Sequence, residues 1–281
     1  MSPDQPFATV AILGLGAMGG SLARALSGLA SGPTVVGWSP IEDERNAATR
    51  QGAVSSAPPE WQEAVSGADL VVVAAPLQAT CHLMAGLAEA TSSETTLSDV
   101  ASLKAPVERA VEGGGARARW VGSHPMTGSH ESGFSASRAD LYRGAKVWCV
   151  AHADADSRVA RLHAFWKALG ARPASIDADD HDRLMALASH LPQLVSNVLA
   201  NVMAQHVSPD QLGPGGTDMT RLSASGPELW RDILEHASPE LTGGLRALAD
   251  EARHVADLLE AGDLDAIEEL MRRTKLWSST S

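Results

Sequence analysis

Short apolar runs and amphipathic stretches alternate along the first part of the chain. Runs rich in β-forming residues occupy positions 8–13, 34–38, 68–75, 96–100, 120–123, 146–151 and 172–176, and a helical pattern occupies 157–169. Short apolar runs separated by helical segments are typical of buried parallel strands. The pattern therefore predicts an α/β domain with a doubly wound sheet over residues 1–176.

The pattern changes near Asp177, after which no further strand-helix alternation occurs. Long amphipathic stretches cover 182–204, 239–260 and 264–276, with Gly262 as a break between the last two. Apolar residues at helical spacing predict helices. We therefore expect an all-α C-terminal domain over residues 177–281, whose last helices serve packing or dimerisation.

A glycine-rich turn follows the first predicted strand. Gly14, Gly16 and Gly19 have the GxGxxG spacing, and Ala17 and Met18 begin a helical pattern. Such glycines permit a tight turn, a close approach of the backbone to a pyrophosphate, and close packing of helix on strand. The N–H groups at the start of the helix suit an anion. The context predicts a Rossmann-type dinucleotide site formed by these five residues.

The residue after the second predicted strand bears on the type of cofactor. NAD enzymes usually place an acid there to hold the ribose hydroxyls, whereas this chain has Ser39. A short hydroxyl with Arg45 and Arg50 downstream suits a 2′-phosphate, although Glu42 and Asp43 are close in the sequence. The residues leave both NAD and NADP open and lean toward NADP.

Two other strand ends carry candidate binding residues. Pro76 and Leu77 follow the third predicted strand, and Ser102 follows the fourth. The carboxyl ends of parallel strands form the edge where such sheets bind ligands, so we expect Pro76 and Leu77 at the cofactor. We expect Ser102 to hydrogen-bond the substrate or a histidine, or to cap a helix over 106–111.

The stretch 121–134 combines histidines, serines and glycines around one proline. Its candidate reactive side chains are His124, Ser129 and His130. Glycines and hydroxyls are unfavourable inside strands and helices and belong where the backbone meets a ligand. Histidine exchanges protons near neutral pH. The stretch therefore predicts a catalytic loop.

The helical half has its own polar candidates. Three of them share one face of the first long amphipathic stretch: His190, Gln193 and Asn197. A polar stripe on a buried helix needs partners or a ligand, and Pro192 should kink this helix. Arg221 ends a glycine-rich segment, 213–221, which we expect to be a flexible loop, and an arginine there suits a carboxylate.

Composition restricts the classes of partner. With 22 Lys and Arg against 34 Asp and Glu, the formal net charge is -12, which repels nucleic acid and anionic membranes. The first residues have no basic stretch followed by a long apolar one, and no apolar run reaches transmembrane length. The two cysteines, Cys81 and Cys149, lack metal-binding or redox spacing. We expect a cytoplasmic enzyme with reduced, buried thiols and no nucleic-acid or membrane partner.

Four sequence blocks together carry a family resemblance: Gly14 to Gly19; Asp99 to Lys104; Gly122 to Ser129; and Ser189 to Gln193 with Asp218 to Arg221 and Pro227 to Ile233. The first block is shared with many oxidoreductases, whereas the other three in this order are specific. Over nearly its whole length the chain resembles the prephenate/arogenate dehydrogenase family.

The resemblance implies a reaction and a set of roles. Members oxidise the ring alcohol of prephenate with loss of the ring carboxylate, giving 4-hydroxyphenylpyruvate, CO2 and a reduced nicotinamide cofactor in tyrosine biosynthesis. By this likeness His124 accepts the hydroxyl proton, Ser102 supports it, and Arg221 binds a substrate carboxylate. The other residues implied near the substrate are His190, Gln193, Trp230, Ser129 and His130. The resemblance also implies a homodimer.

The chain departs from the family pattern at two places. His130 stands where many members have an acid, with Glu131 one position later, which weakens a preference for arogenate. After Gly215 and Gly216 the family usually has Phe-Arg-Asp, whereas this chain has Thr217 and Asp218. The resemblance implies that this segment lies near the partner subunit's pocket, and the segment here lacks the family's cation.

Other functions stay open on the residues alone. Arogenate or 4-amino-4-deoxyprephenate dehydrogenase would keep every motif. A β-hydroxyacid dehydrogenase shares the glycine turn but needs a lysine that 182–204 lacks. A cofactor-binding sensor without activity is disfavoured because the candidate reactive residues are retained. A zinc site from His124, His130 and His190 has no suitable ligand spacing, so we expect no metal.

Overall fold

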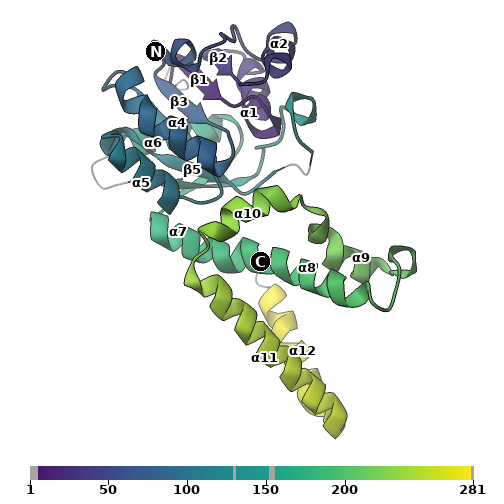
Figure 1. Cartoon of the computed structure of the whole chain (residues 1–281). Helices are drawn as coiled ribbons and strands as arrows, with labels where there is room; N and C mark the ends of the chain where they lie inside the picture. The colour runs from purple at the N-terminus through teal and green to yellow at the C-terminus, as the bar shows by residue number, and fades with distance from the viewer. Residues whose placement is uncertain (1–5, 129–130, 152–155, 280–281) are drawn as a thin grey trace. The chain divides into compact units, whose positions relative to one another are not determined.

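The computed structural model describes residues 6–128, 131–151 and 156–279 (Figure 1). It divides into two compact units. The first, called here the sheet unit, comprises Met1–Leu184 together with Ser225–Ala237, and the second, the helical unit, comprises Met185–Ala224 and Ser238–Ser281. The domain boundary expected near Asp177 stays a prediction, and the two units are described separately.

The sheet unit contains a four-stranded parallel sheet in the order β2-β1-β3-β4. Its strands are β1 (Thr9–Leu13), β2 (Thr34–Trp38), β3 (Leu70–Val73) and β4 (Thr96–Asp99). Every residue of β3 and β4 is buried, as expected for parallel strands covered on both faces. The predicted Rossmann-type α/β fold is confirmed.

A second sheet of three strands adjoins the first. It consists of β5 (Gly122–Pro125), β6 (Lys146–Val150) and β7 (Arg172–Ile176), with β5 antiparallel to β6 and β6 parallel to β7. The amide N–H of Val121 donates to the carbonyl oxygen of Leu97 at 2.9 Å and links the entry to β5 with β4. The three-stranded sheet is therefore mixed, because β5 is antiparallel to β6 whereas β7 is parallel to it.

Helices pack around the sheets, as Figure 1 shows for α1, α4 and α6. The α-helices described in the sheet unit are α1 (Ala17–Ser27), α2 (Glu42–Arg50), α3 (Trp61–Val65), α4 (Leu77–Ala90), α5 (Ala105–Gly113), α6 (Asp156–Ala168), α7 (Ala178–Met185) and α10 (Pro227–Glu235). Two apolar clusters form the core. Leu22 and Trp166 belong to one, whereas Met84 and Trp120 belong to the other.

The described part of the helical unit contains a π-helical turn (Ala186–His190), two 3-10 turns (Pro209–Gln211 and Arg221–Ala224) and four α-helices. These are α8 (Leu191–Met203), α9 (Pro214–Thr220), α11 (Pro239–Ala261) and α12 (Leu264–Ser278). Pro192 lies in the first turn of α8, directly after the π turn, and the kink expected at this residue stays a prediction. Gly262 ends α11 with a left-handed φ of 71°, which confirms the predicted break.

The expected flexible loop before Arg221 is wrong, because this segment forms α9. Pro214 occupies the first turn after the cap residue Gly213, a position that favours proline. The hydroxyl of Thr217 donates to the carbonyl oxygen of Gly213 at 3.2 Å. A glycine-rich sequence therefore folds as a helix here, with a proline in its first turn.

Both cysteines are free. Cys149 is buried, and burial raises the pKa of its thiol to about 12, whereas Cys81 is only half-buried. Within the described part of the chain, no helix combines the length and apolar character that crossing a membrane requires.

Candidate active site

Three parallel strands end in register at one edge of the four-stranded sheet. Leu13 of β1 pairs with Val73 of β3, which in turn pairs with Asp99 of β4. The segments that follow these strands therefore start side by side, and they contain the glycine turn, Pro76 with Leu77, and Ser102. This is the edge at which such sheets bind ligands.

The glycine turn is shaped for a close backbone approach. Gly14 has a φ of 107°, and a β-carbon there would lie 2.2 Å from the carbonyl oxygen of Ala74. A β-carbon at Gly19 would lie 1.8 Å from the carbonyl oxygen of Gly14. At Gly16 the nearest atom to such a carbon is a carboxylate oxygen of Glu44, 3.9 Å away.

The start of α1 completes this turn. Gly16 is the cap residue, and Ala17 and Met18 form the first helical positions. The carbonyl oxygen of Met18 accepts a hydrogen bond from the Tyr142 hydroxyl at 2.8 Å, and this contact fixes the first turn of α1. A helix N-terminus whose cap residue has no side chain fits a pyrophosphate.

The residues behind the expectation of NADP are engaged within the protein. Ser39 is buried, and its hydroxyl donates to the carboxylate of Glu44 at 2.5 Å. Arg45 donates to the carbonyl oxygen of Ser39 at 2.6 Å. The hydroxyl and the cation that suggested a 2′-phosphate site already have partners, and a carboxylate lies near Gly16. These contacts weigh against a 2′-phosphate site at Ser39 and Arg45, and the preference between NAD and NADP stays a prediction.

His124 lies on β5. The preceding residue, Ser123, holds this strand in place through hydrogen bonds to its neighbours. The Ser123 hydroxyl lies 3.1 Å from that of Ser98 on β4 and accepts a hydrogen bond from the indole of Trp166 at 2.9 Å. The Lys104 ammonium donates to the Ser123 carbonyl oxygen at 2.6 Å. The backbone next to the His124 imidazole is thus held through both the hydroxyl and the carbonyl group of Ser123.

Lys104 belongs to a fully buried ion pair with Asp99. The Asp99 carboxylate also accepts hydrogen bonds from the backbone N–H of Ala101 at 2.9 Å and from the indole of Trp120 at 3.0 Å. A buried charge is tolerated only when it is paired and hydrogen-bonded, and both conditions are met here. The pair therefore forms a rigid support behind β5.

The imidazole of His124 is part of a chain of three side chains. Its Nδ1 lies 2.8 Å from Nε2 of His181, and Nδ1 of His181 lies 2.7 Å from a carboxylate oxygen of Asp182. The two rings meet edge to face, with centroids 5.0 Å apart. His181 is fully buried, whereas His124 is half-buried. The reactive candidate is therefore backed by a second imidazole and a carboxylate.

Asp182 also caps α5. Its carboxylate oxygens accept hydrogen bonds from the backbone N–H groups of Lys104 at 2.8 Å and Ala105 at 2.9 Å. Because α5 begins at Ala105 with Lys104 as the cap residue, the predicted capping by Ser102 is wrong. Ser102 is half-buried in the segment between β4 and α5, and its role at the substrate stays a prediction.

The charge states of the His181 and Asp182 pair follow from these contacts. Burial raises the pKa of Asp182, but hydrogen bonds from His181 and from two backbone N–H groups outweigh burial and keep this pKa below its usual value. Burial lowers the pKa of His181, against the opposing hydrogen bond to Asp182. At neutral pH the pair is therefore a carboxylate beside a neutral imidazole.

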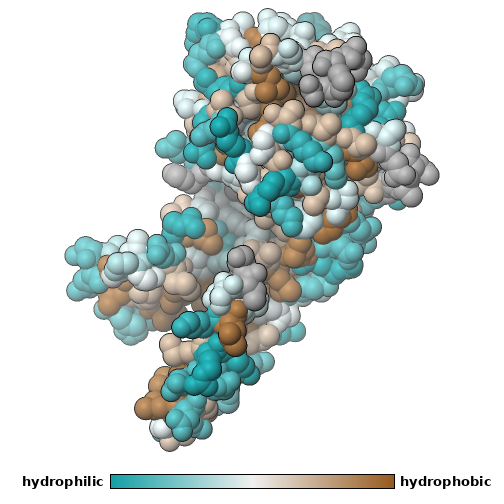
Figure 2. All heavy atoms as spheres, turned by 180° about the vertical axis from the view of Figure 1, so that it is seen from behind, coloured by the Kyte–Doolittle hydropathy of each residue, from teal (hydrophilic) through white to brown (hydrophobic). Residues whose placement is uncertain are grey.

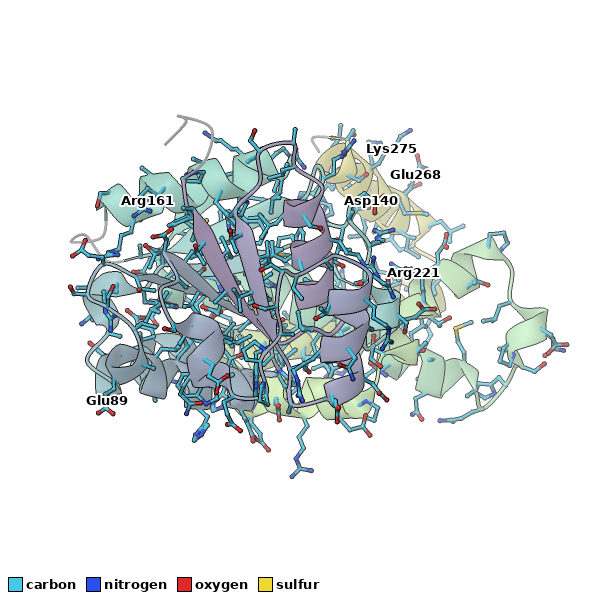
Figure 3. The ribbon with its side chains drawn as sticks, turned by 90° about the horizontal axis from the view of Figure 1, so that it is seen from above. Glu89, Asp140, Arg161, Arg221, Glu268 and Lys275 are labelled. Atoms are coloured by element: carbon cyan, nitrogen blue, oxygen red, sulfur yellow. The ribbon has the colours of Figure 1, made fainter. Side chains whose placement is uncertain are left out.

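In the helical unit, the polar stripe has partners within the protein. Gln193 is buried and donates to Asn197 at 2.9 Å and to the carbonyl oxygen of Leu222 at 2.8 Å. His190 is buried on the π turn. Arg221, labelled in Figure 3, is exposed and immediately precedes Leu222. Gln193 thus anchors the segment that carries Arg221.

The remaining predicted site residues differ in how far the structure describes them. Leu77 and Trp230 contribute to the same apolar cluster of the sheet unit, and Pro76 caps α4. Ser129 and His130 lie outside the described residues. Within the described ranges, no group of three or more histidine, cysteine or acidic side chains is arranged to hold a metal ion. The expectation of a metal-free site stays a prediction.

Sequence reasoning missed His181, Asp182 and the Asp99 and Lys104 pair. His181 is separated from His124 by 57 positions in the sequence, and nothing in their local patterns links them. A usable signal was the adjacent His-Asp pair at the start of a mainly apolar helix. Buried polar residues at such a position need partners.

Both halves of the chain match family models. Residues 22–174 match the nucleotide-binding domain of prephenate dehydrogenase, and residues 177–273 match its dimerization domain. The chain belongs to the prephenate dehydrogenase family. The resemblance stated from the sequence is thereby confirmed, and the chain is assigned to a family of nicotinamide-dependent oxidoreductases.

Relatives of this family are similar over most of the chain. The cyclohexadienyl dehydrogenase of Zymomonas mobilis is 28% identical over 96% of this chain and 94% of its own length. The prephenate dehydrogenase of Bacillus subtilis is 29% identical over 81% of this chain, which spans 64% of that relative's length. A crystal structure of the prephenate dehydrogenase from A. aeolicus, with hydroxyphenyl propionate and NAD+, has a TM-score of 0.85 at 24% identity. It covers 95% of this chain and 96% of that chain. This last likeness shows the shared fold.

Proposed function

We propose that this protein oxidises the ring alcohol of prephenate and releases the ring carboxylate as CO2, giving 4-hydroxyphenylpyruvate for tyrosine biosynthesis. The observation that carries the proposal is the fixed imidazole of His124 at the end of β5, hydrogen-bonded to His181, in a chain of the prephenate dehydrogenase family. A positioned imidazole is the usual proton acceptor for an alcohol that loses hydride.

The proton and electron balance explains why one imidazole suffices. His124 takes the hydroxyl proton while C4 loses hydride, and the electron pair of the bond to the departing carboxylate completes the aromatic ring. The product first carries a phenolate oxygen, to which His124 returns the proton. No net proton is released, so the site needs an acceptor whose proton is readily returned, which an imidazole near neutral pH provides.

When bound, the nicotinamide supplies the hydride acceptor. The residues proposed to hold the cofactor are those of the strand ends: Gly14, Gly16, Ala17, Met18, Gly19, Ser39, Pro76 and Leu77. The Glu44 carboxylate next to Gly16 supports NAD over NADP, because it would accept hydrogen bonds from ribose hydroxyls and repel a 2′-phosphate. We therefore propose NAD as the preferred cofactor.

The substrate is an anion, and the protein has a net charge of -12, so binding requires local cations. We propose Arg221 as the group that binds a substrate carboxylate in bidentate fashion. Gln193, through its hydrogen bond to Leu222, positions the Arg221 segment. Ser102, His190 and Trp230 are proposed to line the substrate site.

Two substrates are alternatives within the same chemistry. Arogenate and 4-amino-4-deoxyprephenate each keep the ring carboxylate, and the Zymomonas relative is named for cyclohexadienyl substrates in general. With arogenate His124 would accept the same hydroxyl proton, whereas with 4-amino-4-deoxyprephenate it would accept a proton from the C4 amino group. The groups that distinguish them lie at the far end of the side chain or at C4 of the ring.

We also propose that the protein acts as a cytoplasmic homodimer. The helical unit exposes large apolar side chains on several helices: Val198 and Val202 on α8, Leu248 and Leu259 on α11, and Met271, Leu276 and Trp277 on α12. Figure 2 shows hydrophobic residues at the surface among hydrophilic ones. A second copy of the chain would cover such helices, as the match to a dimerization domain supports. Light scattering of the purified protein tests this.

The deciding experiment is a matrix of three substrates, prephenate, arogenate and 4-amino-4-deoxyprephenate, against NAD+ and NADP+. The readouts are reduced-cofactor absorbance and CO2 release. We expect the highest kcat/KM with prephenate and NAD+. His124→Asn should lower kcat by about 10²-fold to 10⁴-fold, with circular dichroism unchanged. Turnover of none of the three substrates, or full activity of His124→Asn, would overturn the proposal.

A further inference from the structure

The contacts of Asp182 determine where the protons lie in the three-residue chain. An ionised carboxylate has only acceptor sites, and Asp182 accepts hydrogen bonds from the N–H groups of Lys104 and Ala105 at the start of α5. Its remaining partner is Nδ1 of His181 at 2.7 Å. Nδ1 of His181 must therefore carry a proton and donate it to this carboxylate.

The tautomer of the next ring follows. His181 is fully buried, in a place where a second proton on its ring would have to be accommodated without water. With its proton on Nδ1, a neutral His181 has its lone pair on Nε2. That lone pair lies 2.8 Å from Nδ1 of His124. His124 must therefore donate from Nδ1, which leaves the lone pair of its own ring on Nε2.

We propose that His181 and Asp182 are positioning residues that hold His124 in the Nδ1–H tautomer and take up its positive charge during turnover. This rests on the proposed function of His124 as proton acceptor. The hydroxyl proton of the substrate bonds to Nε2 of His124. The Nδ1 proton then shifts along the hydrogen bond toward Nε2 of His181, and the charge comes to lie beside the Asp182 carboxylate. Both protons move back when the phenolate is protonated.

The surrounding charges support this direction of transfer. Asp182 is fixed by three hydrogen bonds, so its charge needs no reorganisation as the imidazolium forms. The ammonium of Lys104 is already neutralised by Asp99. A positive charge on His181 therefore faces a fixed carboxylate on its own helix and a compensated ion pair on the segment before α5.

Two substitutions of His181 distinguish its two proposed functions. One function is to orient the His124 ring, and the other is to take up the positive charge of His124 during turnover. In His181→Asn the shorter amide retains a donor for Asp182 but falls short of His124. In His181→Gln the longer amide offers its oxygen to Nδ1 of His124 but cannot accept a proton as imidazole does. We expect His181→Asn to lower kcat by about 10²-fold, and His181→Gln to recover part of this loss, with KM for both reactants changed less than about threefold in each variant.

Asp182→Asn tests the role of the carboxylate charge. One carboxylate oxygen accepts from both the Lys104 N–H and Nδ1 of His181, so an amide oxygen in its place keeps both contacts and the Nδ1–H tautomer of His181. The variant loses the negative charge that balances the imidazolium, and the expected loss in kcat is about 10²-fold. Asp180→Asn, at an exposed position of the same helix, is the matched control and should leave kcat unchanged.

Nitrogen NMR of histidine-labelled protein without substrate provides a readout that does not depend on activity. The His124 ring should show a protonated Nδ1 in the wild type, in Asp180→Asn and in Asp182→Asn. Wild-type His124 protonated at Nε2, or His181→Asn with kcat within twofold of wild type, would overturn the inference. Absence of turnover with all three substrates would instead contradict the proposed function, since the NMR result does not involve substrate.

Discussion

Nδ1 of His124 lies 2.8 Å from Nε2 of His181, so the side chain best suited to accept a proton is oriented by a second imidazole rather than by solvent. His124 comes from β5 and His181 from α7, and Asp182, the next residue on α7, also caps α5. One carboxylate therefore orients the histidine pair and fixes the helix that follows β4. Disturbing either contact should affect both the scaffold and the chemistry.

Lys104→Met should strongly destabilise the sheet unit. The substitution leaves the buried carboxylate of Asp99 without its cation, and breaking a buried pair in this way costs about 3–5 kcal/mol. The free energy of unfolding from urea titration measures the effect. The double variant Asp99→Asn with Lys104→Met should recover much of the loss, because no uncompensated charge stays buried.

The matched control for this ion pair is Arg117→Met. Arg117 forms an ion pair with Glu112 at the protein surface, where such pairs contribute about 0–1 kcal/mol. If Lys104→Met were no more destabilising than Arg117→Met, the assignment of Lys104 and Asp99 as the support behind β5 would be wrong.

Glu44→Gln should shift cofactor use toward NADP+. The Glu44 carboxylate lies near Gly16 and accepts from Ser39, where it would repel a 2′-phosphate. We expect the ratio of kcat/KM for NADP+ to that for NAD+ to rise about tenfold or more. Glu42→Gln, an exposed position on the same helix, should leave this ratio unchanged. An unchanged ratio in Glu44→Gln would contradict the proposed preference for NAD.

Arg221→Ala should weaken substrate binding far more than cofactor binding. Loss of a charge-assisted hydrogen-bond pair predicts an increase in KM for prephenate of about 10-fold to 100-fold, with KM for the cofactor nearly constant. Arg253→Ala, which removes another exposed arginine of the helical unit, is the control. Equal increases in both constants for Arg221→Ala would argue against a carboxylate contact.

Much of the fold could be predicted because each strand is a short apolar run, which can be recognised from neighbouring residues in the sequence alone. The strands at 34–38 and 172–176 were placed at their observed positions, and Gly262 ends α11 as its sequence indicates. β5 is displaced by two residues from the predicted 120–123. The reason is that Trp120 is buried with its indole bound to Asp99, a contact that a local pattern does not reveal.

The active site could be predicted only where one side chain carries the signal alone. His124 stands out within a histidine and glycine-rich stretch, and the glycine turn within a strand-helix context. His181 and Asp182 gain their meaning from contacts with β5 and α5 that connect distant parts of the chain. The glycine-rich segment that forms α9 was predicted as a loop because glycine has a low helix propensity. Propensity is a weak local preference that the surrounding structure can override.

Stability should fall as the pH drops below about 6.5, the ordinary value for histidine, through protonation of His181 in the unfolded chain. Burial lowers the pKa of folded His181. The charged groups around this ring are Asp182 and Asp99, which raise its pKa, and Lys104, which lowers it. The ring of His124 also contacts it. Between the folded and unfolded pKa values the unfolded state binds more protons, so the free energy of unfolding decreases with falling pH. The depressed pKa of Asp182 adds a further loss only below about pH 4.

Urea titrations at several pH values between 5 and 7 measure how the free energy of unfolding changes with pH. This change should be smaller for His181→Asn than for the wild type. His163→Asn should behave differently: His163 on α6 is also lowered by burial, but it lies away from the histidine pair, so this variant should keep the contribution of His181. Equal slopes for the wild type and His181→Asn would contradict the assignment of the acid sensitivity to His181.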